Sequence, residues 1–294
     1  MNPGRADAPY RSTVTALKEQ MPYLKVPGPF ETDIHYHDQG KGQPVVLIHG
    51  WPLSHRMWES QITALTEAGY RCIAYDRRGF GESGKPAGGY DYDTFASDLE
   101  ALMTKLDLHD AVLAGFSMGG GEVARYIGRN GTGRVAKTML LGSVTPFLMK
   151  TPDNPEGVDK SVFDGMLAGL KKDRIAFLEQ FFPNFYNYEA GGAISADLLA
   201  FSKSIAWPAS PLATQQCVVA FGGTDFRADL AKFDVPTLIA HGDSDRIVPF
   251  EVSGKRAHQM VKGSRLELLK GFPHGFAATH AQKLNELMLD FLRA

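Results

Sequence analysis

Cysteine, net charge and long apolar runs are all scarce in this chain of 294 residues, and each shortage excludes something. Cys72 and Cys217 are the two cysteines, too few for a disulfide framework, so we expect two reduced thiols. The formal net charge is −2, from 31 basic and 33 acidic residues, which gives no overall attraction to nucleic acid or to anionic lipid. No segment has the ~18 apolar residues that span a bilayer, and the charged N-terminal stretch contains no secretory signal. We therefore expect a cytoplasmic protein whose partners are neither nucleic acid nor membrane.

Motifs for cofactors are missing as well. The chain has no P-loop, no zinc-type cluster of histidine and cysteine, and no haem-attachment motif. Gly79 and Gly81 form too short a pattern for a dinucleotide loop. We interpret the segment 76–83, which contains them, as a tight turn whose charges pair locally. The sequence therefore predicts no metal and no cofactor.

A regular alternation of short apolar segments and amphipathic segments runs through most of the chain. The strands predicted from it are 33–37, 45–48, 71–75, 111–114, 135–141, 237–240 and 266–269. The helices predicted between them are 57–68, 94–106, 119–127, 252–260 and 278–292. Strands that alternate with helices predict an α/β fold with a mostly parallel, doubly wound sheet and helices on both faces.

Two segments depart from this alternation. Residues 1–30 are rich in proline and are predicted to form an N-terminal arm, with at most a short helix at 13–20. Residues 146–229 are helical and aromatic in pattern, and we expect a helical cap inserted late in the sheet. The core then consists of 31–145 and 230–294. A cap of this composition over the carboxyl ends of the strands predicts an apolar pocket for a small or aromatic acyl group.

Ser117 is the predicted nucleophile. It is the central residue of Gly115-Phe116-Ser117-Met118-Gly119, which has the form G-x-S-x-G and lies between a predicted strand and a predicted helix. A serine on such a strained turn needs small neighbours, and the glycines meet that need. The N-terminus of the following helix favours a developing oxyanion.

His274 is the predicted base. In this kind of fold the nucleophile, the acid and the histidine follow one another in the chain, and five of the nine histidines precede Ser117. His241 closes a predicted strand, and His258 and His280 lie in helical patterns. His274 remains, in a loop between the last strand and the last helix, where the base belongs.

The acid and the oxyanion donors come from two further loops. Asp243 and Asp245 both follow the predicted strand 237–240, and spacing alone does not decide which of them would orient His274. For the oxyanion we expect the backbone N–H of Met118, which follows the nucleophile, and that of Trp51, in the loop after strand 45–48. Pro52 has no N–H to offer.

In these motifs the chain resembles α/β-hydrolases of the bacterial cofactor-free haloperoxidase, or perhydrolase, group, which also contains aryl esterases. The resemblance runs from residue 33 to the C-terminus and rests on the segments 49–54, 75–81, 115–126, 224–227 and 273–276. It implies the α/β-hydrolase fold, a serine triad without metal or haem, and a homo-oligomer. It also implies that Asp245 is the acid, and that a proline beside the oxyanion residue, here Pro52, accompanies perhydrolysis.

The function expected from these features is serine-dependent acyl transfer. Ser117 attacks a small carboxylic ester or acid, and the acyl-enzyme is released by water or by hydrogen peroxide, which yields a peracid. One alternative is another serine hydrolase of the same fold that cleaves C–C bonds or lactams. Epoxide hydrolases and haloalkane dehalogenases need a carboxylate at the elbow, so Ser117 argues against them. A non-catalytic small-molecule receptor is the alternative from a different class.

Overall fold

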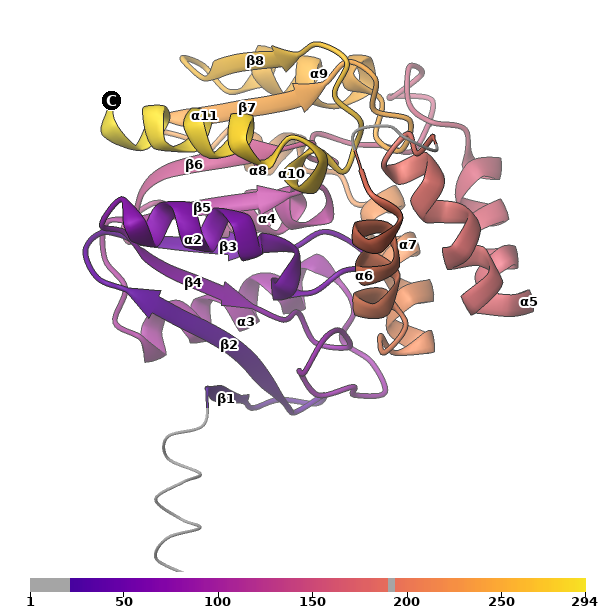
Figure 1. Cartoon of the computed structure of the whole chain (residues 1–294), viewed down its shortest axis with the longest axis horizontal. Coiled ribbons are helices and arrows are strands. Elements are labelled where there is room, and N and C mark those ends of the chain that lie inside the picture. Colours follow the sequence, from indigo (N-terminus) through magenta and orange to yellow (C-terminus); the bar gives the residue numbers. More distant parts are fainter. Residues whose placement is uncertain (1–21, 190–193) are drawn as a thin grey trace, which may run out of the picture.

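The centre of the protein is a sheet of eight strands in the order β1-β2-β4-β3-β5-β6-β7-β8, as a computed structural model of residues 22–189 and 194–294 describes it (Figure 1). Its strands are β1 (Tyr23–Val26), β2 (Thr32–Gly40), β3 (Pro44–Ile48), β4 (Arg71–Tyr75), β5 (Ala111–Phe116), β6 (Val135–Leu141), β7 (Thr237–Gly242) and β8 (Arg265–Leu269). Strands β3 to β8 run parallel, whereas β1 and β2 pair antiparallel at one edge. The predicted α/β fold with a mostly parallel sheet is confirmed.

Helices cover both faces of this sheet, which explains why its central strands consist mainly of apolar residues. Every residue of β5 and β7 is buried. One face carries α2 (Glu59–Glu67) and α11 (Ala281–Arg293), which pack on each other. The other face carries α3 (Tyr92–Lys105), α4 (Met118–Asn130), α8 (Arg227–Leu230) and α9 (Gly254–Met260), each in contact with the next. When helices cover both faces of a strand, neither face is exposed to solvent, so both carry mainly apolar side chains.

Two predicted helices are broken in the structure. The segment predicted at 252–260 is a 3₁₀ turn, η2 (Phe250–Val252), followed by α9. The segment predicted at 278–292 is divided into α10 (Phe276–Thr279) and α11, because His280 has the non-helical angles φ −130° and ψ 40°. A further 3₁₀ turn, η1 (His55–Trp58), precedes α2. Each break lies next to a loop at the carboxyl edge of the sheet.

A separate helical layer lies beside that edge, on the right of Figure 1. It consists of α5 (Lys160–Phe185), α6 (Ala196–Ala206) and α7 (Pro211–Gly223), with α5 packed on both others. Helix α5 is kinked at Asp173, whose angles are φ −159° and ψ 96°. The carboxylate of Asp173 accepts the N–H of Ala176 at 2.9 Å, so it begins the second half of the helix as an N-cap would.

The N-terminal part of the chain differs from the expectation in one respect. The helix considered for 13–20 lies outside the described residues, but Tyr23–Val26, within the predicted arm, forms β1. Pro22 and Pro27 bracket this strand, and proline is tolerated at the edge of a sheet, where an N–H is not needed. The prolines that exclude a long helix here are thus compatible with an edge strand.

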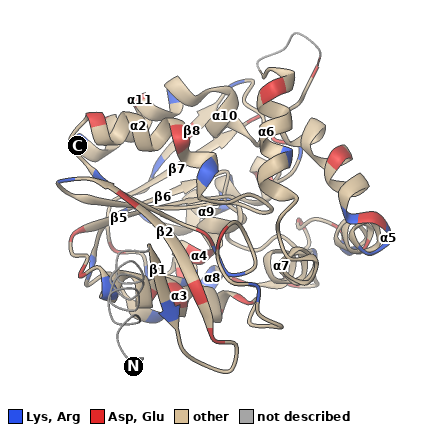
Figure 2. Cartoon of the chain, turned by 60° about the horizontal axis from the view of Figure 1, so that its bottom comes forward, with Lys and Arg blue, Asp and Glu red and all other residues tan. Residues whose placement is uncertain are grey.

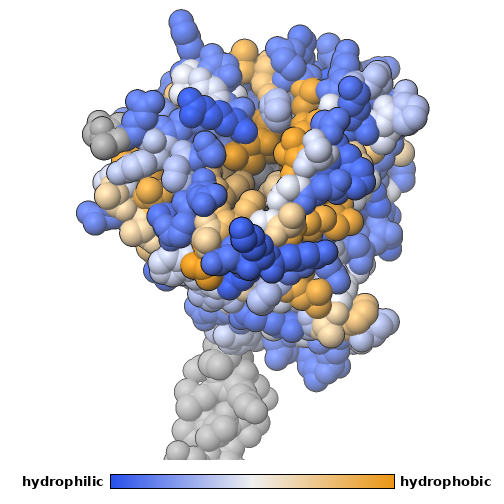
Figure 3. Space-filling view, turned by 90° about the vertical axis from the view of Figure 1, so that its right-hand side faces the viewer, coloured by the Kyte–Doolittle hydropathy of each residue, from blue (hydrophilic) through white to orange (hydrophobic). Residues whose placement is uncertain are grey.

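The surface over the helical layer is apolar at its centre. Viewed from that side, hydrophobic side chains gather in and around a hollow (Figure 3). Val162 of α5 and Val219 of α7 are among the large apolar side chains that stay exposed there. Elsewhere acidic and basic residues are interspersed along the helices (Figure 2). Within the described residues, no helix combines the length and apolarity needed to cross a membrane.

Candidate active site

Ser117 occupies a sharp turn between β5 and α4. Its backbone has φ 54° and ψ −117°, a left-handed conformation that costs energy for a residue with a side chain. Its N–H is held by the carbonyl of Leu141 on the neighbouring strand at 2.8 Å. The backbone is crowded here: a Cβ on Gly115 would overlap Gly119, and one on Gly119 would overlap the carbonyl of Ile48. The glycines of the motif are therefore required by close backbone contacts.

His274 lies within hydrogen-bonding distance of this serine. Its Nε2 is 2.9 Å from Oγ of Ser117, and its Nδ1 is 2.6 Å from Oδ2 of Asp245. The imidazole is fully buried, and the ring of Phe185 lies nearly perpendicular to it, with 4.9 Å between the ring centroids. The loop between β8 and α10 thus brings the predicted base between the predicted nucleophile and one of the two candidate acids.

The two aspartates that spacing could not separate have different partners in the structure. Asp243 accepts the N–H of Gly271 at 2.6 Å and so fixes the start of the loop that carries His274. Asp245 bonds His274 itself, and its Oδ1 accepts the N–H groups of Ile247 and Val248, both at 2.8 Å. The geometry therefore assigns Asp245 to the imidazole and Asp243 to the backbone of the loop.

His241 is a neighbour of this carboxylate that the sequence interpretation had set aside. It is fully buried, and its Nε2 lies 2.8 Å from the carbonyl of Val248 and 3.3 Å from Oδ2 of Asp245. Burial alone would raise the pKa of Asp245, but His274 and His241 outweigh it and hold that pKa well below its usual range. The position of His241 at the end of β7, just before the acid, is the signal that could have identified it.

The predicted oxyanion donors are the backbone N–H groups of Trp51 and Met118. Within the described residues, neither the N–H of Trp51 nor that of Met118 donates to an acceptor in the protein. A Cβ on Gly50 would come within 3.1 Å of Cβ of Ser117, so the loop before Trp51 runs against the nucleophile. The indole of Trp51 is anchored by its Nε1–H, which donates to the carbonyl of Thr214 in α7 at 3.1 Å. Two backbone donors are thus available next to Ser117.

A buried ion pair supports the loop that carries Trp51. The guanidinium of Arg77 pairs with Glu122 at 2.7 Å and donates to the carbonyl of His49 at 2.9 Å. Burial, reinforced by the charge of Arg77, lowers the pKa of His49 to about 3, so its neutral ring accepts the N–H of Arg77. Arg78 forms a second buried pair, with Asp98. The prediction that these charges pair locally was wrong, because their partners lie on α3 and α4.

An apolar pocket opens beside Ser117 and His274. It encloses about 490 Å³, its open mouth included, and both core loops and the helical layer line it. Its other lining residues are Trp51, Val144, Leu148, Val158, Val162, Phe163, Met166, Phe181, Phe221, Ile247 and Val248. Such walls fit an uncharged, apolar group in contact with the serine.

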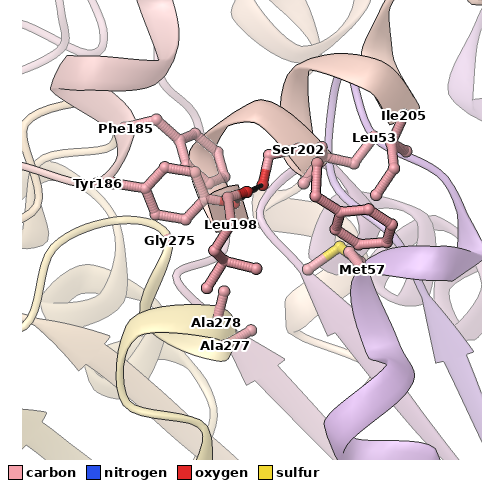
Figure 4. A pocket seen from close by; sticks show the side chains of 11 residues that line it. Leu53, Met57, Phe185, Tyr186, Leu198, Ser202, Ile205, Gly275, Ala277 and Ala278 are labelled. Carbon is pink, nitrogen blue, oxygen red and sulfur yellow. Dashed lines mark hydrogen bonds between the residues drawn. The ribbon is translucent and has the colours of Figure 1, made fainter. Parts of the chain in front are cut away.

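A second, smaller cavity shares one wall with this site (Figure 4). It lies between α6, the end of α5, and the turns η1 and α10, and its side chains are mostly apolar. The hydroxyls of Tyr186 and Ser202 bond each other there at 2.7 Å. Phe185 lines this cavity and also contacts His274. The cavity contains none of the polar groups that surround Ser117.

The chain is similar to known proteins over most of its length. The family model described as the alpha/beta hydrolase fold matches residues 43–280. The crystal structure of a bromoperoxidase from Bacillus anthracis is 50% identical with a TM-score of 0.89, over 92% of this chain and 99% of that chain. The non-heme chloroperoxidase of Kitasatospora aureofaciens is 42% identical over 88% of this chain and 96% of its own. The bifunctional esterase/perhydrolase of Acinetobacter calcoaceticus is 39% identical over 89% of this chain and 96% of its own.

Proposed function

The chain belongs to the α/β-hydrolase family, within its haloperoxidase and perhydrolase group, and we propose that it is a serine-dependent acyl transferase to water and to hydrogen peroxide. The observation that carries this proposal is the continuous hydrogen-bonded path from Oγ of Ser117 through His274 to Asp245. A serine hydroxyl becomes nucleophilic when an adjacent base takes its proton and a third group orients that base. The three side chains have the geometry for those three roles.

The first half of the reaction forms an acyl-enzyme. Oγ of Ser117 attacks the carbonyl carbon of a carboxylic ester or acid, while Nε2 of His274 takes the hydroxyl proton. The negative charge that develops on the carbonyl oxygen is stabilised by the N–H groups of Trp51 and Met118. His274 then gives its proton to the departing alcohol or water. Asp245 keeps Nδ1 of His274 protonated and stabilises the imidazolium.

The second half releases the acyl group. With His274 again as the base, water attacks the acyl-enzyme and yields the acid, or hydrogen peroxide attacks and yields the peracid. A released peracid can oxidise a halide ion to hypohalous acid, which returns the carboxylic acid. The protein supplies no electrons in any of these steps, so this route accounts for a haloperoxidase activity in the group to which the chain belongs.

The substrates proposed are small molecules whose acyl part is apolar. The pocket beside Ser117 has aliphatic and aromatic walls, and Trp51 makes edge contacts with the rings of Phe181 and Phe221. We treat residues 146–229 as a cap, which supplies much of the wall of this pocket. The core, residues 31–145 and 230–294, supplies the reacting groups. Residues 1–30 are treated as an N-terminal arm. Residues 23–26 of that arm belong to the sheet. A homo-oligomer is also proposed, and light scattering of the purified protein measures it.

The test of the proposed function is the burst of p-nitrophenol from p-nitrophenyl acetate. Ser117→Ala should abolish the burst and lower kcat by about 10⁶-fold, the order of magnitude found when a triad nucleophile is removed. Ser202→Ala is a matched control, because it removes another buried serine hydroxyl, in the second cavity, and should keep the burst. A burst of wild-type amplitude in Ser117→Ala would overturn the assignment, and absence of turnover in the wild type would favour the receptor.

A further inference from the structure

A second cluster of histidine and aspartate lies outside the site described above. It consists of His35 on β2, His55 in η1 and Asp76 after β4. Their nitrogen and oxygen atoms that could bind a metal all lie within 4.8 Å of one another. Oδ1 of Asp76 is 2.8 Å from Nδ1 of His55, and Oδ2 is 3.3 Å from Nδ1 of His35. Asp76 therefore lies between two imidazole nitrogens.

One atom of this cluster has an unmet bonding capacity. His35 is 8% exposed, and its Nδ1 is buried and has no hydrogen-bond partner among the described residues. That nitrogen nevertheless faces the fully buried carboxylate of Asp76. A buried polar atom without a hydrogen-bond partner destabilises the folded protein. A ligand bound between His35 and Asp76 would give this nitrogen a partner and remove that cost.

We propose that His35, His55 and Asp76 bind a divalent transition-metal ion, with Zn²⁺ as the ion that fits best. Zinc bonds imidazole nitrogen and carboxylate oxygen at about 2.0–2.2 Å, which in a tetrahedral site separates neighbouring ligand atoms by about 3.3 Å. The 3.3 Å between Oδ2 of Asp76 and Nδ1 of His35 agrees with that value, and the 2.8 Å between Oδ1 and Nδ1 of His55, a hydrogen bond in this structure, would lengthen when the ion replaces the proton. Three protein ligands leave a fourth position for water.

The surroundings of the cluster resemble the supporting groups of known metal sites. Ligating histidines usually donate their other N–H to a carboxylate, and ligating carboxylates are themselves hydrogen-bonded. Here Nε2 of His35 lies 3.7 Å from the carboxylate of Glu82, close enough for charge attraction but too far for a hydrogen bond. The oxygens of Asp76 accept the backbone N–H groups of His55 at 2.7 Å and of Glu82 at 2.9 Å. The carboxylates of Asp76 and Glu82 also favour a doubly charged cation.

A path from solvent leads to the cluster. The side chain of His55 is 13% exposed, and it forms part of the wall of a surface pocket with His37, Gln39, Arg56 and Glu59. His37 stacks on His55 at 6.3 Å between ring centroids, but its Nε2 bonds the side chain of Gln39. His37 thus belongs to the same surface without facing Asp76, which makes it a suitable control.

A metal at this position would connect three segments that are distant in the sequence. It would join the edge strand β2, the turn η1 and the loop after β4, and η1 follows the loop that carries Trp51. An ion that binds the folded state and not the unfolded chain raises the melting temperature. The inference does not depend on the proposed acyl-transfer function, because none of its ligands belongs to the path from Ser117 to Asp245.

The experiment measures Zn²⁺ binding to tag-free protein stripped of metal, by competition with a chromophoric chelator. The wild type should bind one equivalent, and its melting temperature should rise with Zn²⁺. His35→Gln and His55→Gln should weaken that binding by more than ~100-fold, beyond what loss of a supporting group costs. His37→Gln should bind like the wild type.

Two results would overturn the proposal: no equivalent of Zn²⁺ bound by the wild type, or an equivalent retained in His55→Gln. If His35→Gln does not fold, His55→Gln decides alone, because that side chain is partly exposed and its loss leaves the core intact. Co²⁺ provides an independent readout. Its visible absorption bands should appear with the wild type and with His37→Gln, and be absent with His55→Gln.

Discussion

Two aspartates with buried carboxylates, Asp245 after β7 and Asp76 after β4, follow strands of one sheet that three other strands separate, and each lies between two histidines. Both carboxyls have a pKa held well below its usual range, because the close contact and the charge of the neighbouring imidazoles outweigh the effect of burial. In each pair one histidine, His241 or His35, has a buried Nδ1 without a partner among the described residues. The two clusters therefore share a buried carboxylate between two imidazoles, but the unpartnered Nδ1 of His35 faces Asp76, whereas His241 turns its Nε2 toward Asp245.

The difference lies in what the other histidine reaches. His274 extends from Asp245 to the hydroxyl of Ser117, so the imidazole is placed to take the proton of that hydroxyl. His55 extends from Asp76 to a surface pocket whose lining residues include no serine or cysteine. A histidine–aspartate pair is thus not by itself a catalytic element. Its third partner decides whether it is positioned for proton transfer or for a ligand.

The largest effect expected from breaking the catalytic cluster comes from Asp245→Asn. The amide would favour the wrong tautomer of His274, and kcat for p-nitrophenyl acetate should fall by about 10⁴-fold. Asp243→Asn is the control on the same loop, and it should cost far less activity because Asp243 bonds only backbone and the hydroxyl of Ser244. The two kcat values are compared at one pH. If Asp243→Asn is the inactive variant, the two roles are reversed.

Breaking the second cluster should affect stability more than activity. In Asp76→Asn the two imidazoles lose their carboxylate, and the free energy of unfolding, measured with urea, should fall by about 2–3 kcal/mol. The loss of kcat should remain at least about 100-fold smaller than that of Asp245→Asn. Wild-type kinetics with wild-type stability would show that the cluster contributes nothing to the fold.

The pH dependence of this difference has a definite sign. The folded pKa of Asp76 lies below the unfolded value of about 3.9, so between the two the unfolded chain binds more protons. The stabilisation by the carboxylate is then complete above about pH 4 and is lost as the pH falls through the folded pKa. Wild type and Asp76→Asn should differ most near neutral pH and converge in acid. A difference that grows in acid would contradict this explanation.

The strands at the centre of the sheet were the easiest part of the fold to predict. The predicted segments 71–75 and 135–141 coincide with β4 and β6, because a strand covered on both faces is mainly apolar along its length. Strand β1 was missed because it is a four-residue edge strand and mostly half-buried. The break at His280 was missed because this residue does not interrupt the amphipathic pattern of 278–292 in the way that proline does.

The residues of the site also differ in how well the sequence predicted them. The proximity of Ser117 and His274 could be predicted because each has a local signal, the small neighbours of the elbow and the loop after the last strand. Asp245 could not be separated from Asp243 by spacing, since both follow β7 and only the three-dimensional course of the loop distinguishes them. The cluster of His35, His55 and Asp76 had no signal at all, because its members come from three segments and form no motif.

A smaller loss of activity is expected from a change at His241, the second histidine beside Asp245. Its Nε2–H is shared between the carbonyl of Val248 and Asp245, so its loss removes part of what orients the carboxylate. One hydrogen bond to a charged group corresponds to about 1.5 kcal/mol, and His241→Gln should lower kcat by about tenfold with little change in KM. His258→Gln, whose Nδ1 bonds Ser264, is the control and should keep wild-type kcat. Equal kcat in wild type and His241→Gln would limit the orienting groups to Ile247 and Val248.

The smallest effect is expected from a change at Pro52, in the loop that connects the catalytic cluster with the cluster at Asp76. Trp51, at the oxyanion side, and His55, at the Asp76 side, are joined by a short segment that begins with the buried Pro52. Proline fixes its own φ near about −65° and restricts the residue before it, so Pro52 determines where both the N–H and the carbonyl of Trp51 point. A carbonyl directed toward the acyl-enzyme can accept a hydrogen bond from hydrogen peroxide and favour it over water.

One such bond contributes roughly 0.5–1.5 kcal/mol, which corresponds to a shift of about tenfold or less between the two acceptors. The wild type should form peracetic acid from acetate and hydrogen peroxide, and Pro52→Leu should lose this activity faster than ester hydrolysis. Both rates are measured on the same preparations, so that a loss of folded protein cancels in their ratio. Binding of Zn²⁺ at His55 should stay within about twofold of wild type, because Pro52 is not among its ligands. An unchanged ratio of the two rates would leave Pro52 with a role in shaping the turn alone.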